Sequence, residues 1–348
     1  MKLLKQSFFT IFLITTSLAN AIDEQEYKPA SIWTTYAQTG SLPKKEIIPS
    51  FLKDCQKARD AGENDKIPAH DKTIARIAVY NVHFWTSPER KPAYAGIMNT
   101  IKNIQADVIA LQEVLLFDPE KINNDFAHLG YRYRTFMPMN RWKGHLFGNM
   151  IVSKYPFDTK PYKKTYDADQ YSKREKRNFI HTIITLPDTN KISLCGTHLD
   201  VWDETEQKRL AEVKELIAHA CADTYPNKVL LADWNAVRKQ DYQYNVAQKQ
   251  VWKLLTKNFQ ERTGLTQVPT QTLDYIESAG FTDSFAKKGI PSPRYTVWSG
   301  TRVDLIYLAQ TWKLPIRGCY VYYGTNPEEE SDHMPIIMDV LLQPKAKL

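Results

Sequence analysis

From Ile74 onward the sequence predicts a layered domain of the α/β or α+β class. Short apolar runs of four to six residues alternate there with longer stretches of helical periodicity, which is typical of strands and helices packed in layers. The chain has 348 residues, of which 43% are hydrophobic, and this is ample for a buried core. A disordered or low-complexity protein is therefore not expected.

The first 21 residues have the pattern of a secretory signal peptide. Lys2 and Lys5 precede an apolar stretch at residues 8–18, and Ala19-Asn20-Ala21 supplies the small residues of a cleavage site. We therefore predict a secreted or periplasmic protein whose mature chain begins at Ile22. A retained membrane anchor is the alternative, but the apolar stretch is short for a membrane span.

Residues 22–73 are polar and weakly patterned, with one helix-like stretch near residues 46–58. We predict that they form an N-terminal extension wrapped on the domain. The catalytic domain then occupies residues 74–348.

Each expected strand is a short apolar run, and each expected helix has apolar residues at three- and four-residue steps. The strands are expected at residues 77–80, 108–111, 150–152, 180–185, 192–196, 229–232, 303–308, 320–323 and 336–341. The helices are expected at residues 93–104, 204–222, 242–258 and 270–279. In the second helix the apolar spacing predicts one buried face, formed by Leu210, Val213, Ile217 and Ala220.

Export would permit disulfides between the four cysteines Cys55, Cys195, Cys221 and Cys319. Three pairings are possible, and the sequence does not choose among them. A free thiol is an equal alternative for Cys195, which lies in an expected buried strand. Their spacing does not fit a zinc site.

The positive charge of the chain is concentrated in one segment. The formal net charge of +7 falls to +5 if Lys2 and Lys5 leave with the signal peptide. Between residues 160 and 177 basic residues alternate with tyrosines; the basic residues include Lys163, Lys164, Lys173, Arg174 and Lys176. Such a loop would attract nucleic acid or an anionic membrane surface, although a solvated loop with no binding role is the alternative.

Polar residues gather where the expected strands end. They are Asn81, Glu113, His198, Asp200, Asp233, Asn235, Asp304, Asp332 and His333. Carboxylates on several strand ends can hold a hard divalent cation beside an activated water, which is what a metal-dependent hydrolase needs. Taken singly, each residue also has a structural explanation, such as a turn cap at Asn81 or an ion pair between Asp304 and Arg302.

Taken together, these residues resemble the endonuclease/exonuclease/phosphatase superfamily, which includes deoxyribonuclease I, AP endonucleases, neutral sphingomyelinases and inositol polyphosphate 5-phosphatases. The resemblance covers residues 74–342. Its markers are Asn81, Gln112-Glu113-Val114, the block at residues 148–153, Thr197-His198-Leu199, Asp233-x-Asn235, Arg302-x-Asp304 and Ser331-Asp332-His333. The resemblance implies a four-layer sandwich of two packed mixed β-sheets flanked by helices, with the site at one edge of the sheets.

The resemblance also implies a metal centre and a nucleophile. Glu113 would be the main magnesium ligand, with Asn81 and Asp332 close to the metal. Asp233 would orient or deprotonate the attacking water, and Asn235 would hold that water or a phosphate oxygen. Carboxylate and amide oxygens without thiolates suit Mg²⁺ or Mn²⁺ better than Zn²⁺.

Two histidines would face the scissile phosphate. His333 would contact it as a cation, with Asp304 buried behind the ring, and His198 would be the second histidine. Three further residues are expected to bind substrate: Arg177, Asn149 and Arg302. Arg177 is included because deoxyribonuclease I has an arginine similarly placed before the corresponding strand.

The chain departs from its relatives at several positions. Ala232 replaces a common glycine, which is a mild change. His83 stands where some AP endonucleases have an acidic metal ligand, and this disfavours that subgroup. The Trp-Cys block of the 5-phosphatases is absent, since residues 299–302 read Ser-Gly-Thr-Arg.

Three functions remain open from the sequence. The first is a secreted nuclease that hydrolyses phosphodiester bonds of DNA or RNA, which the positive charge favours. The second is a lipid phosphodiesterase or phosphoinositide phosphatase acting on anionic membrane lipid. A binding protein without activity is the third, and it is disfavoured because every expected catalytic position carries a competent side chain. We expect a monomer.

Overall fold

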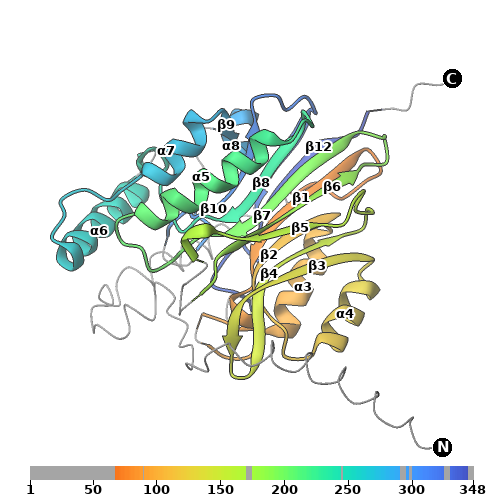
Figure 1. The fold of residues 1–348 in the computed structure, drawn as a ribbon, viewed down its shortest axis with the longest axis horizontal. Helices are drawn as coiled ribbons and strands as arrows, with labels where there is room; N and C mark the ends of the chain where they lie inside the picture. Colours follow the sequence, from red (N-terminus) through yellow and green to blue (C-terminus); the bar gives the residue numbers. More distant parts are fainter. Residues whose placement is uncertain are drawn as a thin grey trace, which may run out of the picture.

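The computed structural model describes residues 67–343 apart from residues 89, 170–174, 244–245, 291–294, 298–299 and 325–329. It contains two six-stranded mixed sheets packed face to face, with helices on their outer faces (Figure 1). This is the four-layer sandwich that the sequence predicts. The expected signal peptide and residues 22–66 of the expected extension lie outside the described residues.

The two sheets have the following strands. The first has the spatial order β11 (Ile316–Val321), β12 (Ile336–Leu341), β1 (Ile74–Asn81), β2 (Val108–Leu115), β4 (His145–Ser153) and β3 (Tyr133–Trp142). The second has the order β5 (Tyr162–Thr165), β6 (Asn178–Thr185), β7 (Lys191–His198), β8 (Lys228–Asp233), β10 (Asp304–Ala309) and β9 (Phe281–Asp283).

The helices and short 3-10 turns connect these strands. The helices are α3 (Tyr94–Ile104), α4 (Pro119–His128), α5 (Gln207–Ala222), α6 (Val246–Thr263), α7 (Gln271–Ser278) and α8 (Ser284–Lys288). The 3-10 turns are η2 (His83–Trp85), η3 (Asp167–Asp169) and η4 (Lys239–Tyr242). Asp118 begins α4 by accepting a hydrogen bond from the Lys121 N–H at 3.0 Å, with Pro119 next to it.

Three apolar clusters hold the layers together. The largest lies between the sheets and includes Ile77, Leu194 and Leu231. A second packs α3 and α4 against the first sheet, and a third packs α5 and α7 against the second sheet. Because β1 is covered on both faces, all eight of its residues are buried, which explains its nearly continuous apolar sequence.

Strand direction brings several strand ends to one edge of the sandwich. β1 is parallel to β2, and β7 is parallel to β8. β10 runs antiparallel to β8, with Asp304 opposite Asp233, so its first residue lies at the end of β8. Similarly, β12 is antiparallel to β1, so the residues before Ile336 lie beside the end of β1. The polar residues at these ends must therefore converge.

The expected elements are found, with differences at their ends. The strand expected at residues 320–323 lies at Ile316–Val321, and the helix expected at residues 242–258 lies at Val246–Thr263. The sequence did not indicate α4, β3, β5, β9 or α8. β3 and β5 are partly exposed, so their residues lack the long apolar run that identifies a buried strand.

The expected basic loop at residues 160–177 is partly regular structure. Lys163 and Lys164 lie in β5, where Lys163 Nζ donates to the Phe136 carbonyl at 2.7 Å and Lys164 pairs with Glu215. Lys173 and Arg174 lie outside the described residues. Within the described part of this segment, Lys163 and Lys164 each make a contact within the fold, and the predicted binding surface stays a prediction.

Cys195 and Cys319 are buried free thiols, and Cys221 is an exposed one. Cys55 lies outside the described residues. No helix in the described part of the chain is long and apolar enough to cross a membrane.

Candidate active site

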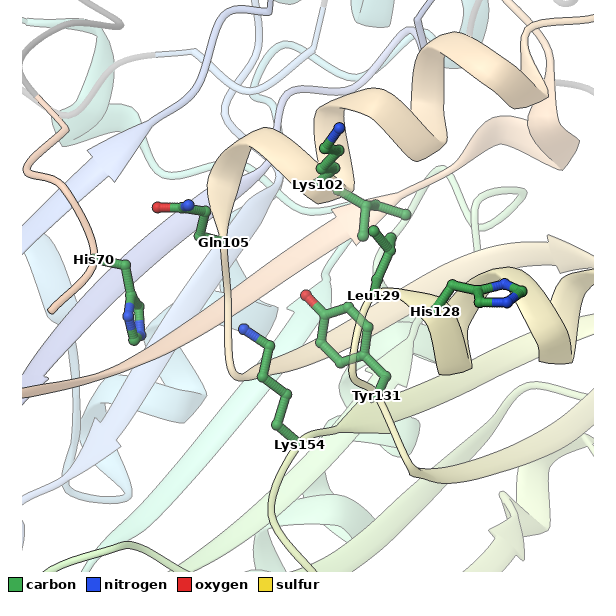
Figure 2. A pocket seen from close by; sticks show the side chains of 8 residues that line it. His70, Lys102, Gln105, His128, Leu129, Tyr131 and Lys154 are labelled. Atoms are coloured by element: carbon green, nitrogen blue, oxygen red, sulfur yellow. The ribbon is translucent and has the colours of Figure 1, made fainter. Parts of the chain in front are cut away.

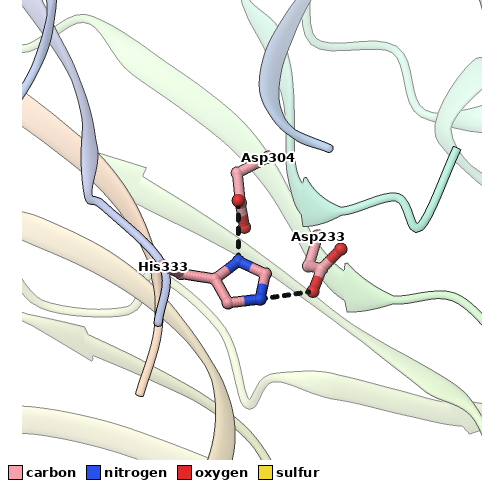
Figure 3. A group of neighbouring side chains, drawn as sticks. All are labelled: Asp233, Asp304 and His333. Carbon is pink, nitrogen blue, oxygen red and sulfur yellow. Dashed lines mark hydrogen bonds and ion pairs between the residues drawn. The ribbon is translucent and has the colours of Figure 1, made fainter. Parts of the chain in front are cut away.

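The core of the site is a histidine between two aspartates, His333, Asp304 and Asp233 (Figure 3). His333 Nδ1 lies 2.8 Å from Asp304 Oδ2, and His333 Nε2 lies 3.8 Å from Asp233 Oδ2. Burial alone would lower the pKa of His333, but the Asp304 carboxylate raises it well above its usual value. His333 is therefore a cation near neutral pH, and Asp304 fixes the orientation of its ring.

Asp233 is held by donors on both of its oxygens. Oδ2 accepts from Asn81 Nδ2 at 2.9 Å, and Oδ1 accepts from the Asn235 backbone N–H at 3.0 Å. Burial and the nearby Asp304 carboxylate raise the pKa of Asp233 to about 6, although the His333 charge opposes this. A carboxylate with this pKa can accept a proton at neutral pH.

His198 is the neutral histidine of the site. Burial, with the positive charge of Arg177, lowers its pKa well below the usual value. Asn235 Nδ2 lies 2.9 Å from His198 Nε2 and also donates to the Leu199 carbonyl at 3.0 Å. This contact assigns the proton to Nδ1, which is buried and has no hydrogen-bond partner within the described residues. The ring therefore keeps one donor for a bound molecule.

Glu113 is brought into the site by an irregularity of β2. The register between β2 and β4 shifts between Leu111 and Val114, and Glu113 adopts a positive φ of 56°. In the described part of the chain its carboxylate has no hydrogen-bond or ion-pair partner. Burial and the Asp332 charge raise the pKa of Glu113 to about 8. The Glu113 carboxylate and the nearby Asp332 Oδ1, which accept no hydrogen bond within the described residues, fit a bound metal ion.

Asp332 and Asn81 complete this oxygen set. Asp332 Oδ1 is buried without a hydrogen bond in the described structure, 3.5 Å from His83 Nδ1 and 3.9 Å from His333 Nε2. Asn81 Oδ1 accepts from the His83 backbone N–H at 2.9 Å and retains a second lone pair. The atoms of Asp233, Asp304 and His333 lie closer together, but Asp304 Oδ2 and His333 Nδ1 already pair with each other, and the positive charge of His333 disfavours a cation there. Glu113 and Asp332, with Asn81, therefore fit the metal better.

Three further residues support the site: Ser331 belongs to a marker motif, His83 marks only a departure from the AP endonucleases, and Thr296 carries no motif. His83 is buried beside Asp332, with its Nε2 lacking a partner among the described residues. Ser331 Oγ donates to the Asn81 carbonyl at 2.6 Å, which joins the ends of β1 and β12. Thr296 Oγ1 accepts from the Asp304 N–H at 3.1 Å, and its carbonyl accepts from the Met334 N–H at 2.8 Å. Thr296 thus fixes both sides of the Asp304–His333 pair.

The expected substrate-binding residues have different positions. Arg177 is buried and paired with Glu175, near enough to influence His198. Asn149 Nδ2 donates to Asn178 Oδ1 at 3.0 Å, and its own Oδ1 is buried without a partner in the described chain.

Arg302 does not lie at the reacting centre. It is 2% exposed, and its guanidinium donates to Asp283 at 2.8 and 3.0 Å and to Asp241 at 3.1 Å. Arg238 pairs with the same two aspartates. In this network Arg302 compensates buried carboxylates beside the loop that leads into β10, and the expectation that it binds substrate stays a prediction.

A second acidic cluster lies near the site but already contains a cation. Lys208 Nζ lies 2.6 Å from Asp169, 2.7 Å from Asp200 and 3.9 Å from Glu212. Burial, followed by the Asp169 charge, raises the pKa of Glu212. With a proton on Glu212, the Lys208 ammonium compensates one of the two remaining negative charges, so this cluster is already partly neutralised without a metal.

The described cavity of about 330 Å³ lies at the opposite end of the first sheet (Figure 2). Its polar lining includes His70, Lys102 and Lys154, and none of the site residues contributes to it. Lys154 follows the last residue of β4, whereas the site lies at the first residues of that strand. The cavity is therefore separate from the chemistry described above.

The family assignment follows from a match over most of the chain. A profile of the Endonuclease/Exonuclease/phosphatase family matches residues 78–333, which include both ends of the site, from Asn81 to His333. The chain belongs to this family. Its members are phosphodiesterases and phosphatases, generally metal-dependent. No relative was found among curated proteins.

Solved structures of this family share the fold. An endonuclease/exonuclease/phosphatase from Beutenbergia cavernae DSM 12333 is 16% identical, with a TM-score of 0.59, over 80% of this chain and 74% of that chain. ANGEL2, a 2′,3′-cyclic phosphatase, is 14% identical, with a TM-score of 0.55, over 78% and 96% of the two chains. An AP endonuclease from Archaeoglobus fulgidus is 17% identical, with a TM-score of 0.54, over 76% and 98%. At these identities the likeness concerns the fold alone.

Proposed function

We propose that this protein is a secreted, Mg²⁺- or Mn²⁺-dependent endonuclease that hydrolyses phosphodiester bonds of nucleic acid. The observation that carries the metal-dependent hydrolysis is that the Glu113 carboxylate and Asp332 Oδ1 accept no hydrogen bond within the described residues, beside the cationic His333. The positive net charge favours a polyanionic substrate. Export rests on the signal-peptide pattern of residues 1–21.

Each residue of the site has a separate role in the proposed reaction. A bound Mg²⁺ on Glu113, Asp332 and Asn81 would supply Lewis-acid stabilisation of the phosphoryl oxygens. Asp233 accepts the proton of the attacking water, and Asn81 and Asn235 hold Asp233 in place. His333, as a cation oriented by Asp304, stabilises the negative charge that develops on the phosphate. His198, as a neutral ring, donates a hydrogen bond from Nδ1–H to a phosphate oxygen and keeps its proton.

The metal assignment is tested by Glu113→Gln, which keeps the shape of the side chain and removes its charge. Substituting a residue that hydrogen-bonds a metal ligand typically lowers metal affinity by roughly 10- to 100-fold. Because Glu113 is proposed as a ligand itself, we expect a larger fall in Mg²⁺ affinity, measured by calorimetry, and a fall in activity with it. Glu120→Gln, an exposed change in α4, is the matched control and should alter neither quantity. A folded Glu113→Gln protein with normal Mg²⁺ affinity would contradict the assignment.

The substrate class is tested with plasmid DNA, RNA and liposomes of several head groups. We expect Mg²⁺-dependent release of product from nucleic acid, abolished by a chelator. Product from liposomes alone would instead establish the alternative, a lipid phosphodiesterase or phosphoinositide phosphatase. In the described structure the exposed large apolar side chains are Tyr133, Tyr162 and Leu265, which do not form an obvious membrane-docking group.

A further inference from the structure

The hairpin formed by β3 and β4 extends from the active-site edge of the first sheet (Figure 1). β2 runs toward this edge and carries Glu113 near its end. β4 is antiparallel to β2, and Leu115 lies opposite Phe147. The residues that precede Phe147 in β4 therefore continue past the end of β2, beyond the site.

The end of the hairpin has a defined backbone. Trp142 pairs with His145, and the two residues between them, Lys143 and Gly144, have positive φ values of 48° and 80°. Two positive φ angles in a two-residue connection are typical of a type I′ turn, whose twist matches that of the strands. The tip is thus built as a regular hairpin.

An aromatic contact ties this hairpin to the metal side of the site. The Trp142 ring lies 5.1 Å from the Phe84 ring, which also lies 5.0 Å from Phe147. Phe84 belongs to η2, which begins two residues after Asn81. Because Trp142 is used in this packing, the hairpin has a fixed position relative to Asn81.

The outer side of the hairpin is cationic. Arg141, Lys143 and His145 are exposed, and residues 140–147 contain no acidic residue. Lys143 Nζ lies 4.7 Å from the centre of the Trp142 ring, a cation–π contact that leaves the ammonium accessible. Arg141 Nη1 donates to the Gly144 carbonyl at 3.1 Å, and its other guanidinium nitrogens make no hydrogen bond within the described residues, so they can contact a ligand.

A further cation joins the hairpin to the reacting centre. The Lys176 backbone N–H donates to the Met139 carbonyl of β3 at 3.1 Å, and the Lys176 side chain is exposed. The next residue, Arg177, places its Nη1 3.9 Å from Met139 Sδ and lowers the pKa of His198 through its charge. Because Arg177 is paired with Glu175, Lys176 is the exposed cation at this end of the row. We call Lys176, Arg141 and Lys143 the hairpin ridge.

A ridge of this kind fits a strand of nucleic acid better than a membrane. Successive phosphates of a polynucleotide present a line of charge, which an elongated row of cations can neutralise. Insertion into a bilayer requires exposed apolar side chains, and none of the large ones in the described structure lies at the hairpin tip: Tyr133 is the first residue of β3, at the end away from Trp142, and Tyr162 and Leu265 lie outside the hairpin. A mononucleotide bound at the reacting centre would leave the ridge unused.

We propose that the hairpin ridge binds phosphates of a nucleic-acid strand on one side of the scissile bond, and so makes the enzyme prefer polymers over small phosphodiesters. This inference rests on the proposed function. It assigns the binding role to β3 and β4, in addition to the basic segment at residues 160–177.

The test is the double variant Arg141→Ala/Lys143→Ala in the full chain. Binding of a fluorescent single-stranded oligonucleotide is measured by anisotropy in a chelator, so that no cleavage is required. We expect affinity to fall on the order of 10-fold at low salt, and the log–log salt slope to become shallower by about two units because two phosphate contacts are lost. Hydrolysis of bis(p-nitrophenyl) phosphate with Mg²⁺ should remain unchanged.

The matched control is Lys72→Ala/Lys102→Ala, which removes the same charge from the opposite end of the first sheet. Both lysines are exposed, and Lys102 borders the cavity of Figure 2. An unchanged salt slope in the hairpin variant, or an equal change in the control, would overturn the proposal. So would a parallel loss of small-diester hydrolysis, since the hairpin would then support the site itself. Loss of binding to phosphatidylserine vesicles, with normal oligonucleotide binding, would assign the ridge to a membrane.

Failure of the proposed function gives a different result. If the unmodified protein hydrolyses the small diester but no nucleic acid, the endonuclease assignment is wrong. The anisotropy experiment tests the ridge separately, because it measures binding without turnover.

Discussion

The two histidines of the site have pKa values shifted in opposite directions. Asp304 raises the pKa of His333, whereas burial and Arg177 lower that of His198. One ring is therefore charged and the other neutral at the same pH. This division lets the site offer a cation and a neutral hydrogen-bond donor to one phosphate.

Asp304→Asn tests this division through the pH–rate profile. Activity should rise as Asp233 ionises, with a pKa of about 6, and fall as His333 loses its proton above its raised pKa. The Asp304 charge raises both pKa values, so the variant should shift both limbs to lower pH. We also expect a loss in kcat on the order of 10²-fold. An unshifted profile would show that Asp304 does not act on either group.

At the scale of the elements, the irregular part of β2 depends on close contact with its neighbours. The register shift that displays Glu113 lies next to Gly148 of β4, opposite Val114. A Cβ at residue 148 would lie 2.0 Å from the Met137 carbonyl oxygen and 2.8 Å from Pro138 Cα. These are backbone atoms, which move little. The glycine of the 148–153 block thus permits β3, β4 and β2 to approach one another.

Gly148→Ala should therefore destabilise the protein by about 2–3 kcal/mol, measured by urea unfolding. Gly196→Ala is the matched control, because a Cβ there would meet the Ile151 side chain at 3.2 Å, which can adjust. We expect this control to cost less than about 1 kcal/mol. Equal stability of the two variants would contradict the close approach at β4.

For the whole molecule, the residues proposed to hold the metal come from separate strands of the first sheet. Asn81 ends β1, Glu113 lies in β2, and Asp332 precedes β12. These groups converge only in the folded chain, so a metal that binds them stabilises the fold.

Thermal unfolding tests this linkage. Mg²⁺ at about 100 times its Kd should stabilise the protein by about 2.7 kcal/mol, and a chelator should reverse the shift. The Glu113→Gln variant should show a much smaller shift at the same concentration. An equal shift in both proteins would place the metal elsewhere.

The sequence by itself determined the layered fold class, the family and the positions at which chemistry-bearing residues follow apolar runs. Asn81, Asp233 and Asp332 could be selected because buried strands leave a local signature, and parallel strands end at a common edge. Glu113 could be selected in the same way, but its left-handed backbone conformation, which turns the side chain into the site, could not be predicted from the sequence.

Only the tertiary structure decided which side chains meet. Arg302 lies two residues from Asp304, yet its partners are Asp283 and Asp241. β3 was not predicted because one side of the strand is exposed. The hairpin ridge depends on the pairing of β3 with β4. Local periodicity records which face of an element is buried, whereas a pairing between distant residues depends on the packing of the whole chain.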